Sequence, residues 1–250
     1  MIEFAVQTGR KAGLFIHENF GLDLKVEHKG RIDLVTRVDM QAQQIIIQEI
    51  EKHFPDHGIV AEEGIRKEKE SPFVWFVDPL DGTVNYVHGI PIFCVSLALY
   101  KRDEPYLGVC YNPISGELFW AQAGKGAYLE NKAVGVSHTD KLVDALIVTG
   151  FPYSSDDMQS LIGRFSRILQ EVQGIRRLGS AALDLCYVAC GRFDGFWESG
   201  LQSWDTAAGA VIVQEAGGRV SSFSGSVFSP LRGEIVASNS LIHEKLIGLM

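Results

Sequence analysis

The sequence contains no apolar stretch long enough to cross a membrane. Its longest apolar segments, residues 90–100 and 207–213, are shorter than the roughly 20 residues that a spanning helix needs. The first residues, MIEFAVQTGRKAG, have no apolar segment behind a basic start, and neither end carries a lipidation motif. We therefore expect a cytoplasmic protein with no signal peptide and no membrane partner.

Cysteine is scarce, and the spacing of the cysteines does not indicate a metal site. Only Cys94, Cys110, Cys186 and Cys190 are present, and no two of them form a C-x-x-C pair. A structural zinc site needs more cysteine or histidine nearby. We expect all four to be buried small hydrophobic side chains in a reducing compartment.

Basic residues are outnumbered, since 23 Lys and Arg face 31 Asp and Glu and the formal net charge is −8. Nucleic acid selects a basic surface, so a nucleic-acid partner is not expected. An anionic substrate is still compatible with this charge, because acidic side chains can bind a metal ion that in turn holds a phosphate.

Disorder and repeat architectures are excluded as well. The chain of 250 residues is 46% hydrophobic and 22% charged and shows no internal repeat, which is typical of a globular protein. A chain of this length buries enough surface to fold without disulfides. We expect one domain over residues 1–250, with halves at about 1–140 and 141–250.

Hydrophobic periodicity predicts two helices, then an antiparallel run of strands, then alternating helices and strands. Helices are predicted at residues 3–20, 40–54 (with Asp39 as N-cap), 156–170, 181–191 (with Ser180 as N-cap), 206–216 and 241–249. Strands are predicted at residues 59–61, 73–77, 92–100, 106–111, 117–122, 145–149, 174–177, 194–198, 219–222 and 235–237, with an exposed loop at 65–72. This order predicts an α+β fold of packed sheet and helix layers rather than a βα barrel.

Residues 75–88, WFVDPLDGTVNYVH, hold the most informative pattern. An apolar strand ends at Asp78, and Asp81 follows three residues later. Gly82 allows a ligand to approach the backbone, and Thr83 begins a short helix whose free N–H groups favour an anion. Two carboxylates beside a phosphate site suit magnesium. The alternative is an ordinary Asp-Gly turn with a helix cap.

Other acids strengthen the metal interpretation. Glu62 and Glu63 follow a short strand, Asp205 stands where a helix starts, and Asp33 lies in RIDLVTRVD. Taken alone, Asp205 is equally well explained as an N-cap, and Asp33 as a loop residue. If such acids meet, each like-charge pair about 4 Å apart costs roughly 4 kcal/mol, so divalent metal is needed to keep them charged.

The chain resembles the inositol monophosphatase family, in the lithium-sensitive, magnesium-dependent phosphatase superfamily. The resemblance covers nearly the whole chain and is specific, because several signatures occur in the family's order. They are DLVTRVD (33–39), EEG (62–64), FVDPLDGTVNYVH (76–88), RRLGSAALDLCYVACGRFDGFWE (176–198, typical of the bacterial inositol-1-monophosphatase branch) and WDTAAGAVIVQEAGG (204–218). The resemblance implies a layered αβαβα sandwich and a homodimer.

The resemblance also implies two to three Mg²⁺ ions per site. Glu62, Asp78 and the carbonyl of Leu80 would hold the first ion. Asp78, Asp81 and Asp205 would hold the second, and Glu62 would contact a weaker third. Thr83, backed by Asp33, would orient a metal-bound water for in-line attack, so that Glu62, Thr83 and Asp33 form the catalytic set.

A small phosphorylated polyol is the substrate that the resemblance implies. The N–H groups of Gly82 and Thr83 would hold the phosphate. Glu198 matches a glutamate that hydrogen-bonds inositol hydroxyls, and the substrate-binding set is Asp81, Gly82, Thr83, Ala181, Glu198 and Asp205. This favours an inositol monophosphate. The alternative for Glu198 is a surface acid at a strand end.

Three departures from the animal-type pattern leave the substrate open. Ala61 replaces a frequent glycine, and the loops at residues 64–72 and 27–30 are short. A more open entrance would admit fructose 1,6-bisphosphate, and a nucleotide 3′-phosphate or histidinol phosphate also stays possible with the same chemistry. The alternative of another class is a regulatory binding protein that retains the phosphatase fold, although an intact set of repelling acids argues against pure binding.

Overall fold

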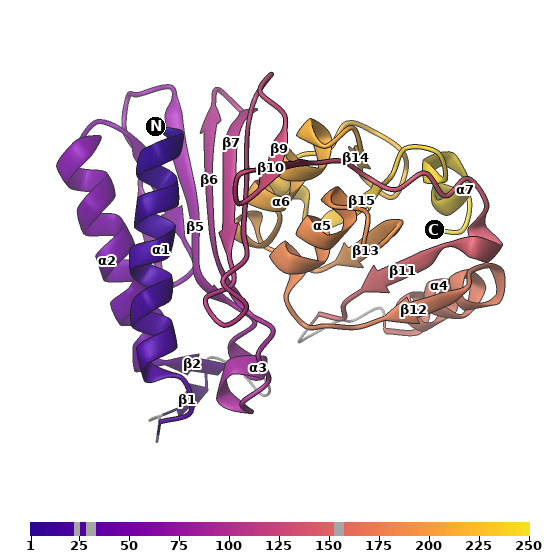
Figure 1. Ribbon diagram of the computed structural model, residues 1–250, viewed down its shortest axis with the longest axis horizontal. Coiled ribbons are helices and arrows are strands. Elements are labelled where there is room, and N and C mark those ends of the chain that lie inside the picture. Colours follow the sequence, from indigo (N-terminus) through magenta and orange to yellow (C-terminus); the bar gives the residue numbers. More distant parts are fainter. Residues whose placement is uncertain (23–25, 29–33, 153–157) are drawn as a thin grey trace.

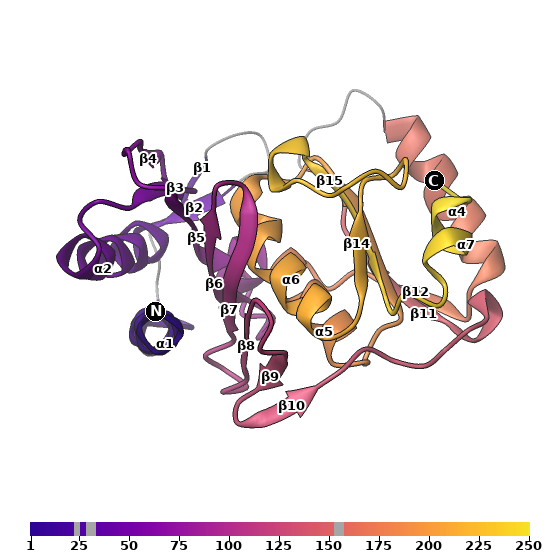
Figure 2. The same ribbon diagram turned by 90° about the horizontal axis from the view of Figure 1, so that it is seen from above.

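A computed structural model describes residues 1–22, 26–28, 34–152 and 158–250. Helices and sheets alternate in five layers, as Figures 1 and 2 show from two sides. The outer helices on one side are α1 (Ile2–Asn19) and α2 (Arg37–His53), the middle helices are α5 (Ala181–Ala189) and α6 (Ser203–Glu215), and the outer helices on the other side are α4 (Met158–Glu171) and α7 (His243–Ile247). The predicted αβαβα sandwich is therefore confirmed.

The sheet between α1/α2 and α5/α6 has eight strands in the order β10-β9-β8-β7-β6-β5-β3-β4, and all its neighbours are antiparallel except β3 and β5. Its strands are β3 (Gly58–Ala61), β4 (Ile65–Lys67), β5 (Phe73–Asp81), β6 (Cys94–Lys101), β7 (Glu104–Tyr111), β8 (Leu118–Gln122), β9 (Ala127–Leu129) and β10 (Lys132–Val134). The predicted antiparallel run is confirmed. The hairpin of β9 and β10 was not predicted, and β4 occupies the start of the expected loop at 65–72.

The second sheet has five strands in the order β12-β11-β13-β15-β14 and is mixed. Its strands are β11 (Leu146–Thr149), β12 (Gly174–Arg176), β13 (Gly195–Ser199), β14 (Arg219–Ser221) and β15 (Glu234–Ser238). Every strand of the large sheet precedes residue 135 and every strand of this one follows residue 145. That separation supports a division near residue 140, and the single domain over 1–250 stays a prediction.

Helix α2 begins three residues before the predicted start, because Thr36 and not Asp39 is its N-cap. The Thr36 hydroxyl accepts hydrogen bonds from the amides of Val38 (3.1 Å) and Asp39 (3.4 Å), and the Asp39 carboxylate accepts one from the Thr36 amide (2.9 Å). This reciprocal arrangement is a capping box. It places Asp39 in the first turn of α2, directly after β2 (Leu34–Thr36), which pairs with β1 (Val26–His28) in a separate two-stranded sheet.

Close backbone packing fixes the middle helices. A Cβ on Gly108 of β7 would lie 2.4 Å from the Ala208 carbonyl oxygen of α6, and one on Gly209 would lie 2.5 Å from Leu185 of α5. Only glycine permits such approaches without movement. Sheet, α6 and α5 are thereby held in one register, which fixes the positions of the side chains at the starts of both helices.

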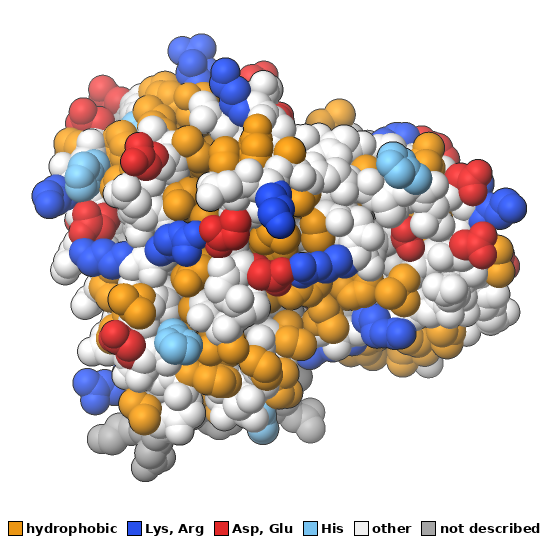
Figure 3. All heavy atoms as spheres, in the orientation of Figure 1, with side chains coloured by type: hydrophobic (Ala, Val, Ile, Leu, Met, Phe, Trp, Pro, Cys, Tyr) orange, Lys and Arg blue, Asp and Glu red, His pale blue; other side chains and the backbone are white. Residues whose placement is uncertain are grey.

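Three of the four cysteines match the prediction, since Cys94, Cys110 and Cys186 are buried while Cys190 is only partly buried, and all four are free thiols. Within the described residues, no helix has both the length and the apolar character needed to span a membrane. On the face shown in Figure 3, acidic and basic side chains are interspersed.

Candidate active site

One cavity of about 390 Å³ gathers the candidate residues. It lies where β3 and β5 end and where α5 and α6 begin, between the two sheets. Every described residue predicted for the site lines it: Glu62, Asp78, Leu80, Asp81, Gly82, Thr83, Ala181, Glu198 and Asp205. Asp33 lies outside the described residues. The residues named from sequence motifs therefore meet at one place.

The first four residues of DPLDG belong to β5 rather than to a turn after it, and Gly82 follows the strand. The pairing register of β5 with β6 shifts between Asp78 and Asp81, so a bulge brings both carboxylates to the cavity. The Leu80 amide donates to the Asp78 carboxylate at 2.9 Å, which fixes the bulge. Gly82 has a φ of +101°, and a Cβ there would lie 3.0 Å from the Ile92 carbonyl oxygen. The glycine is thus required by both backbone conformation and space.

Thr83 contacts Asp39, a partner that was not predicted from the sequence. Its hydroxyl lies 2.9 Å from Asp39 Oδ1 and 3.1 Å from the Leu80 carbonyl oxygen. Asp39 is fully buried, and burial raises its pKa although its hydrogen bonds with Thr36 and Thr83 oppose the shift. Among the described residues, the carboxylate beside Thr83 is therefore that of Asp39, and the predicted contact with Asp33 stays a prediction.

Asp81 joins the two halves of the chain. Its Oδ2 accepts hydrogen bonds from the Ser180 hydroxyl (2.6 Å) and from the Ala182 amide (2.8 Å) at the start of α5. Ser180 is the N-cap residue that was predicted, but its side chain makes no capping bond and donates to Asp81 instead. The acid from the large sheet thereby takes over part of the capping of α5.

Asp205 and Glu62 reach the cavity from opposite sides of the β5 strand end. Helix α6 begins at Ser203, three residues before the predicted start, and Asp205 accepts a hydrogen bond from the Gln202 amide (2.7 Å) in a capping box. It is therefore not the N-cap. Glu62 follows β3, where its amide donates to the Val77 carbonyl (3.1 Å). Two hydrogen bonds between Gln43 and the Glu63 backbone hold this turn to α2.

The acidic side chains that line the cavity repel one another. Burial, reinforced by the charges of neighbouring acids, raises the pKa of Asp78 and Asp205. Burial also raises the pKa of Asp81 to about 6, although Ser180 opposes that shift. Arg177 is the only cation among the described residues that line the cavity. Burial raises the pKa values of Glu198 and Asp184, and the charge of Arg177 opposes part of that rise.

The donor atoms suit a hard divalent cation, because carboxylates and carbonyl oxygens are the ligands that magnesium prefers. Within the described residues, no group of three or more His, Cys, Asp and Glu side chains stands close enough together to enclose an ion. The cavity therefore supplies the right donors and an excess of negative charge, but no closed ligand cage. A cation that drew these oxygens inward would relieve their repulsion.

Glu198, at the end of β13, is only 7% exposed. A Cβ on Gly150 would lie 2.2 Å from its Oε2, so the carboxylate occupies the space that a side chain at residue 150 would fill. Burial raises the pKa of Glu198 to about 8, and the charge of Asp81 adds to the shift. The alternative of a surface acid is excluded, because the side chain is buried in the cavity wall.

The sequence analysis missed Asp184, Asp39 and Arg177. Asp184 is the one charged residue in the apolar helix AALDLCYVA of α5, and a buried acid in an apolar helix was the available signal. Asp39 and Thr83 are 44 residues apart in the sequence, so no local sequence pattern predicts their contact.

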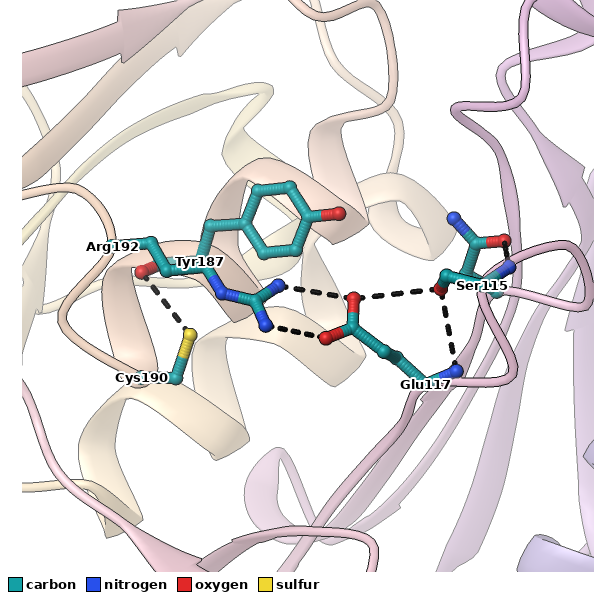
Figure 4. Close-up of polar contacts among 6 residues, drawn as sticks. Ser115, Glu117, Tyr187, Cys190 and Arg192 are labelled. Atoms are coloured by element: carbon teal, nitrogen blue, oxygen red, sulfur yellow. Dashed lines mark hydrogen bonds and ion pairs between the residues drawn. The ribbon is translucent and has the colours of Figure 1, made fainter.

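The far end of α5 is attached to the large sheet by a separate polar cluster (Figure 4). The Arg192 guanidinium donates to both carboxylate oxygens of Glu117, one at 3.0 Å, and lies 4.8 Å from the centre of the Tyr187 ring. Bidentate pairs of this kind orient both partners. The helix is thus held at its C-terminal end by Glu117 and at its N-terminal end by Asp81.

The model of the inositol monophosphatase family matches residues 1–250. The inositol-1-monophosphatase of Synechocystis sp. is 44% identical, over 98% of this chain and 86% of that protein. The Nus factor SuhB of Pasteurella multocida is 39% identical, over 99% of this chain and 94% of that protein. The crystal structure of the extragenic suppressor protein SuhB from Bartonella henselae superposes with a TM-score of 0.95 at 41% identity, covering 99% of this chain and 96% of that one.

Proposed function

Because this chain belongs to the inositol monophosphatase family and is thereby a phosphatase, we propose that it is a magnesium-dependent phosphomonoesterase that hydrolyses inositol monophosphates to inositol and phosphate. The observation that carries the substrate is Glu198, a buried carboxyl in the same cavity as the acid cluster. Buried carboxyl groups that face a ligand site bind hydroxyls well and select against ligands that lack them.

Two to three Mg²⁺ ions per site would be held by Glu62, Asp78, Asp81, Asp205 and the Leu80 carbonyl. This assignment is supported by their meeting in one cavity, by their oxygen donors, and by the raised pKa values of the three aspartates. When bound, magnesium would neutralise the charge of the phosphoryl group and lower the pKa of water. The amides of Gly82 and Thr83 lie at the start of α3 (Thr83–Val87), where N–H groups have no partner within the helix and can receive phosphate oxygens.

Thr83 would position the attacking water. Its hydroxyl carries one proton, and the carboxylate of Asp39 at 2.9 Å is a stronger acceptor than the Leu80 carbonyl at 3.1 Å. With that proton directed to Asp39, the oxygen lone pairs of Thr83 are free to accept a hydrogen bond from water. A water held in this way attacks phosphorus in line with the leaving alcohol oxygen, and Glu62 at the cavity wall completes the catalytic set.

The test is phosphate release from D,L-inositol 1-phosphate and fructose 1,6-bisphosphate in parallel, each with magnesium and with chelator. We expect faster, magnesium-dependent release from the inositol ester. Preference for the bisphosphate would overturn the substrate and keep the chemistry. The assay would then be extended to a nucleotide 3′-phosphate and histidinol phosphate. If folded protein with magnesium hydrolyses none of these esters, the enzymatic proposal is overturned and the regulatory binding role is left, a role that the name of the Nus factor SuhB also suggests.

Fructose 1,6-bisphosphate is the second candidate, because a larger cavity of about 950 Å³ adjoins the first. The two cavities share four lining residues: Glu62, Leu201, Gln202 and Trp204. Its lining has five cations against three acids in a chain whose net charge is −8. Those cations could hold a second phosphate: Arg66, Lys67, Lys69, Arg102 and Arg232. The parallel assay decides between the two substrates.

We further propose a cytoplasmic, lithium-sensitive homodimer, on the family resemblance alone. Light scattering on the purified chain measures the oligomeric state, and a lithium titration of the magnesium-dependent activity measures the inhibition. A monomer, or activity unaffected by lithium, would overturn the respective proposal.

A further inference from the structure

Asp184 is a buried acid that the catalytic proposal leaves without a role. It lies in the first turn of α5, is 1% exposed, and lines the same cavity as Glu198. Its Oδ1 has no hydrogen-bond partner within the described part of the chain. Buried polar atoms in native proteins are nearly always paired, so an unpaired one beside a ligand cavity indicates a missing partner.

A purely structural role does not account for this residue. Its helix neighbours Leu183 and Leu185 are fully buried in the middle layer, and an apolar side chain at residue 184 would extend that layer without the desolvation of a carboxyl group. Burial and the nearby charges of Glu198 and Asp81 raise the pKa of Asp184. The fold therefore tolerates an unfavourable group at a position where it would be more stable without one.

The environment of Asp184 also argues against a phosphate group as its partner. Phosphate would meet an acidic wall, because Asp184, Glu198 and Asp81 influence one another and Arg177 is the only described cation that lines the cavity. Hydroxyl groups are neutral donors and suit carboxyl acceptors. Two carboxyl groups on one wall can receive two hydroxyls of the same molecule.

We propose that Asp184 is a specificity-determining residue that accepts a hydrogen bond from a hydroxyl of the leaving alcohol, beside the hydroxyl held by Glu198. This inference rests on the proposed function, and it names the alcohol: a ring or chain with at least two neighbouring hydroxyls. The reacting phosphoryl group stays with Thr83 and the acid cluster, so Asp184 selects the substrate without taking part in the bond-breaking step.

The experiment compares inositol 1-phosphate with cyclohexyl phosphate, which has the same ring size and no free hydroxyl. Replacement Asp184→Ala should lower kcat/KM for the inositol ester by roughly tenfold or more, as expected for a lost hydrogen bond to a carboxylate. The value for cyclohexyl phosphate should stay within about twofold, since it has no hydroxyl to lose. Asp184→Asn, which keeps an acceptor oxygen and the side-chain volume, should recover part of the difference.

Asp194→Asn is the matched control. Asp194 is a buried carboxylate of the same half that accepts hydrogen bonds from the Ser137 hydroxyl and the Leu146 amide, and it does not line the cavity. We expect this variant to leave the ratio of the two kcat/KM values unchanged, whatever it does to stability. The ratio is measured on folded enzyme and is therefore insensitive to partial loss of protein.

A set of deoxyinositol 1-phosphates identifies the hydroxyl. For the analogue that lacks the group bound by Asp184, wild type and Asp184→Ala should have equal kcat/KM.

Equal losses on inositol and cyclohexyl esters, or no loss on either, would refute the role of Asp184 and leave the proposed function intact. If the wild type instead prefers fructose 1,6-bisphosphate, the substrate proposal fails, and the same variants assayed on that sugar ester still decide whether Asp184 binds a hydroxyl.

Discussion

Asp39 performs two tasks that a single substitution can separate. Its Oδ2 accepts hydrogen bonds from the amide and the hydroxyl of Thr36 and so caps α2, while its Oδ1 accepts the Thr83 hydroxyl at 2.9 Å. In Asp39→Asn one of these oxygens becomes an NH₂ group. The amide oxygen should stay with Thr36, where two donors meet, and the NH₂ group should face Thr83.

The substitution is then expected to alter catalysis far more than folding. The Thr83 hydroxyl can turn its proton to the Leu80 carbonyl at 3.1 Å and accept from the new NH₂ group, so no buried donor is left unpaired. Replacing charged by neutral hydrogen bonds should lower the free energy of unfolding by only about 1–2 kcal/mol. The Thr83 hydroxyl then no longer donates to a carboxylate and its oxygen also accepts from the NH₂ group, so it is a weaker acceptor for the attacking water, and kcat should fall roughly 100-fold or more.

The assay measures phosphate release at saturating magnesium together with urea unfolding. Thr36→Ala serves as the matched control, because it removes the cap but leaves Asp39 and Thr83 in contact. It should lose about 1 kcal/mol of stability and keep kcat within about twofold. Wild-type kcat in Asp39→Asn, or an equally slow Thr36→Ala, would show that Asp39 acts on the fold rather than on Thr83.

Three further substitutions test the charge, the pH response and the packing. Asp205→Asn should stabilise the metal-free protein by removing a repelling charge, should abolish activity, and should reduce the stabilisation by magnesium to that of the first ion; a thermal shift with magnesium as large as that of the wild type would contradict this. Burial lowers the pKa of His243 from 6.5 to about 4. Between these two pH values the histidine is protonated in the unfolded chain but not in the folded one, so the free energy of unfolding should fall by roughly 3 kcal/mol as the pH drops from 6.5 to 4. His243→Gln should lose less over the same range in urea unfolding, and an unchanged pH slope would exclude the histidine as its source. Gly108→Ala should cost roughly 1–3 kcal/mol, because its Cβ would lie 2.4 Å from a backbone oxygen of Ala208. In the same unfolding measurement Gly9→Ala, which lies inside α1 with nothing nearer than 3.5 Å, should be stabilising by about 0.4–1 kcal/mol.

The sequence was sufficient to find the cavity because its residues belong to short motifs at the ends of predictable elements. An apolar segment that leads into DPLDG can be recognised without a structure, and so can the helical pattern that follows SWD, although the helix itself begins at Ser203. The described residues named from these motifs all line one cavity. Layer order was predictable for the same reason, since the alternation of apolar segments specifies which elements are sheet and which are helix.

Contacts between residues far apart in the sequence could not be predicted from local sequence patterns. Asp39 stands immediately before an apolar helical periodicity, which is where an N-cap belongs, and nothing local indicates that Thr83 will lie beside it. Asp184 was overlooked because helix AALDLCYVA is apolar on every side, so its face toward the cavity depends on how α5 packs between two sheets. The hairpin of β9 and β10 was missed because each strand has only three residues.

The two errors in helix starts have one physical origin that bears on the site. Asp39 was predicted as an N-cap and Asp205 was placed just before its helix, and each is instead the third residue of its helix, in a capping box whose N-cap amide donates to its Oδ2. In that position one carboxylate oxygen is fixed by the backbone while the other is directed outward, toward Thr83 for Asp39 and into the acid-lined cavity for Asp205. The N-terminal end of each helix dipole also favours the negative charge. A capping box therefore orients a buried acid without any cation, and only the remaining repulsion among the acids is left for a metal ion to neutralise.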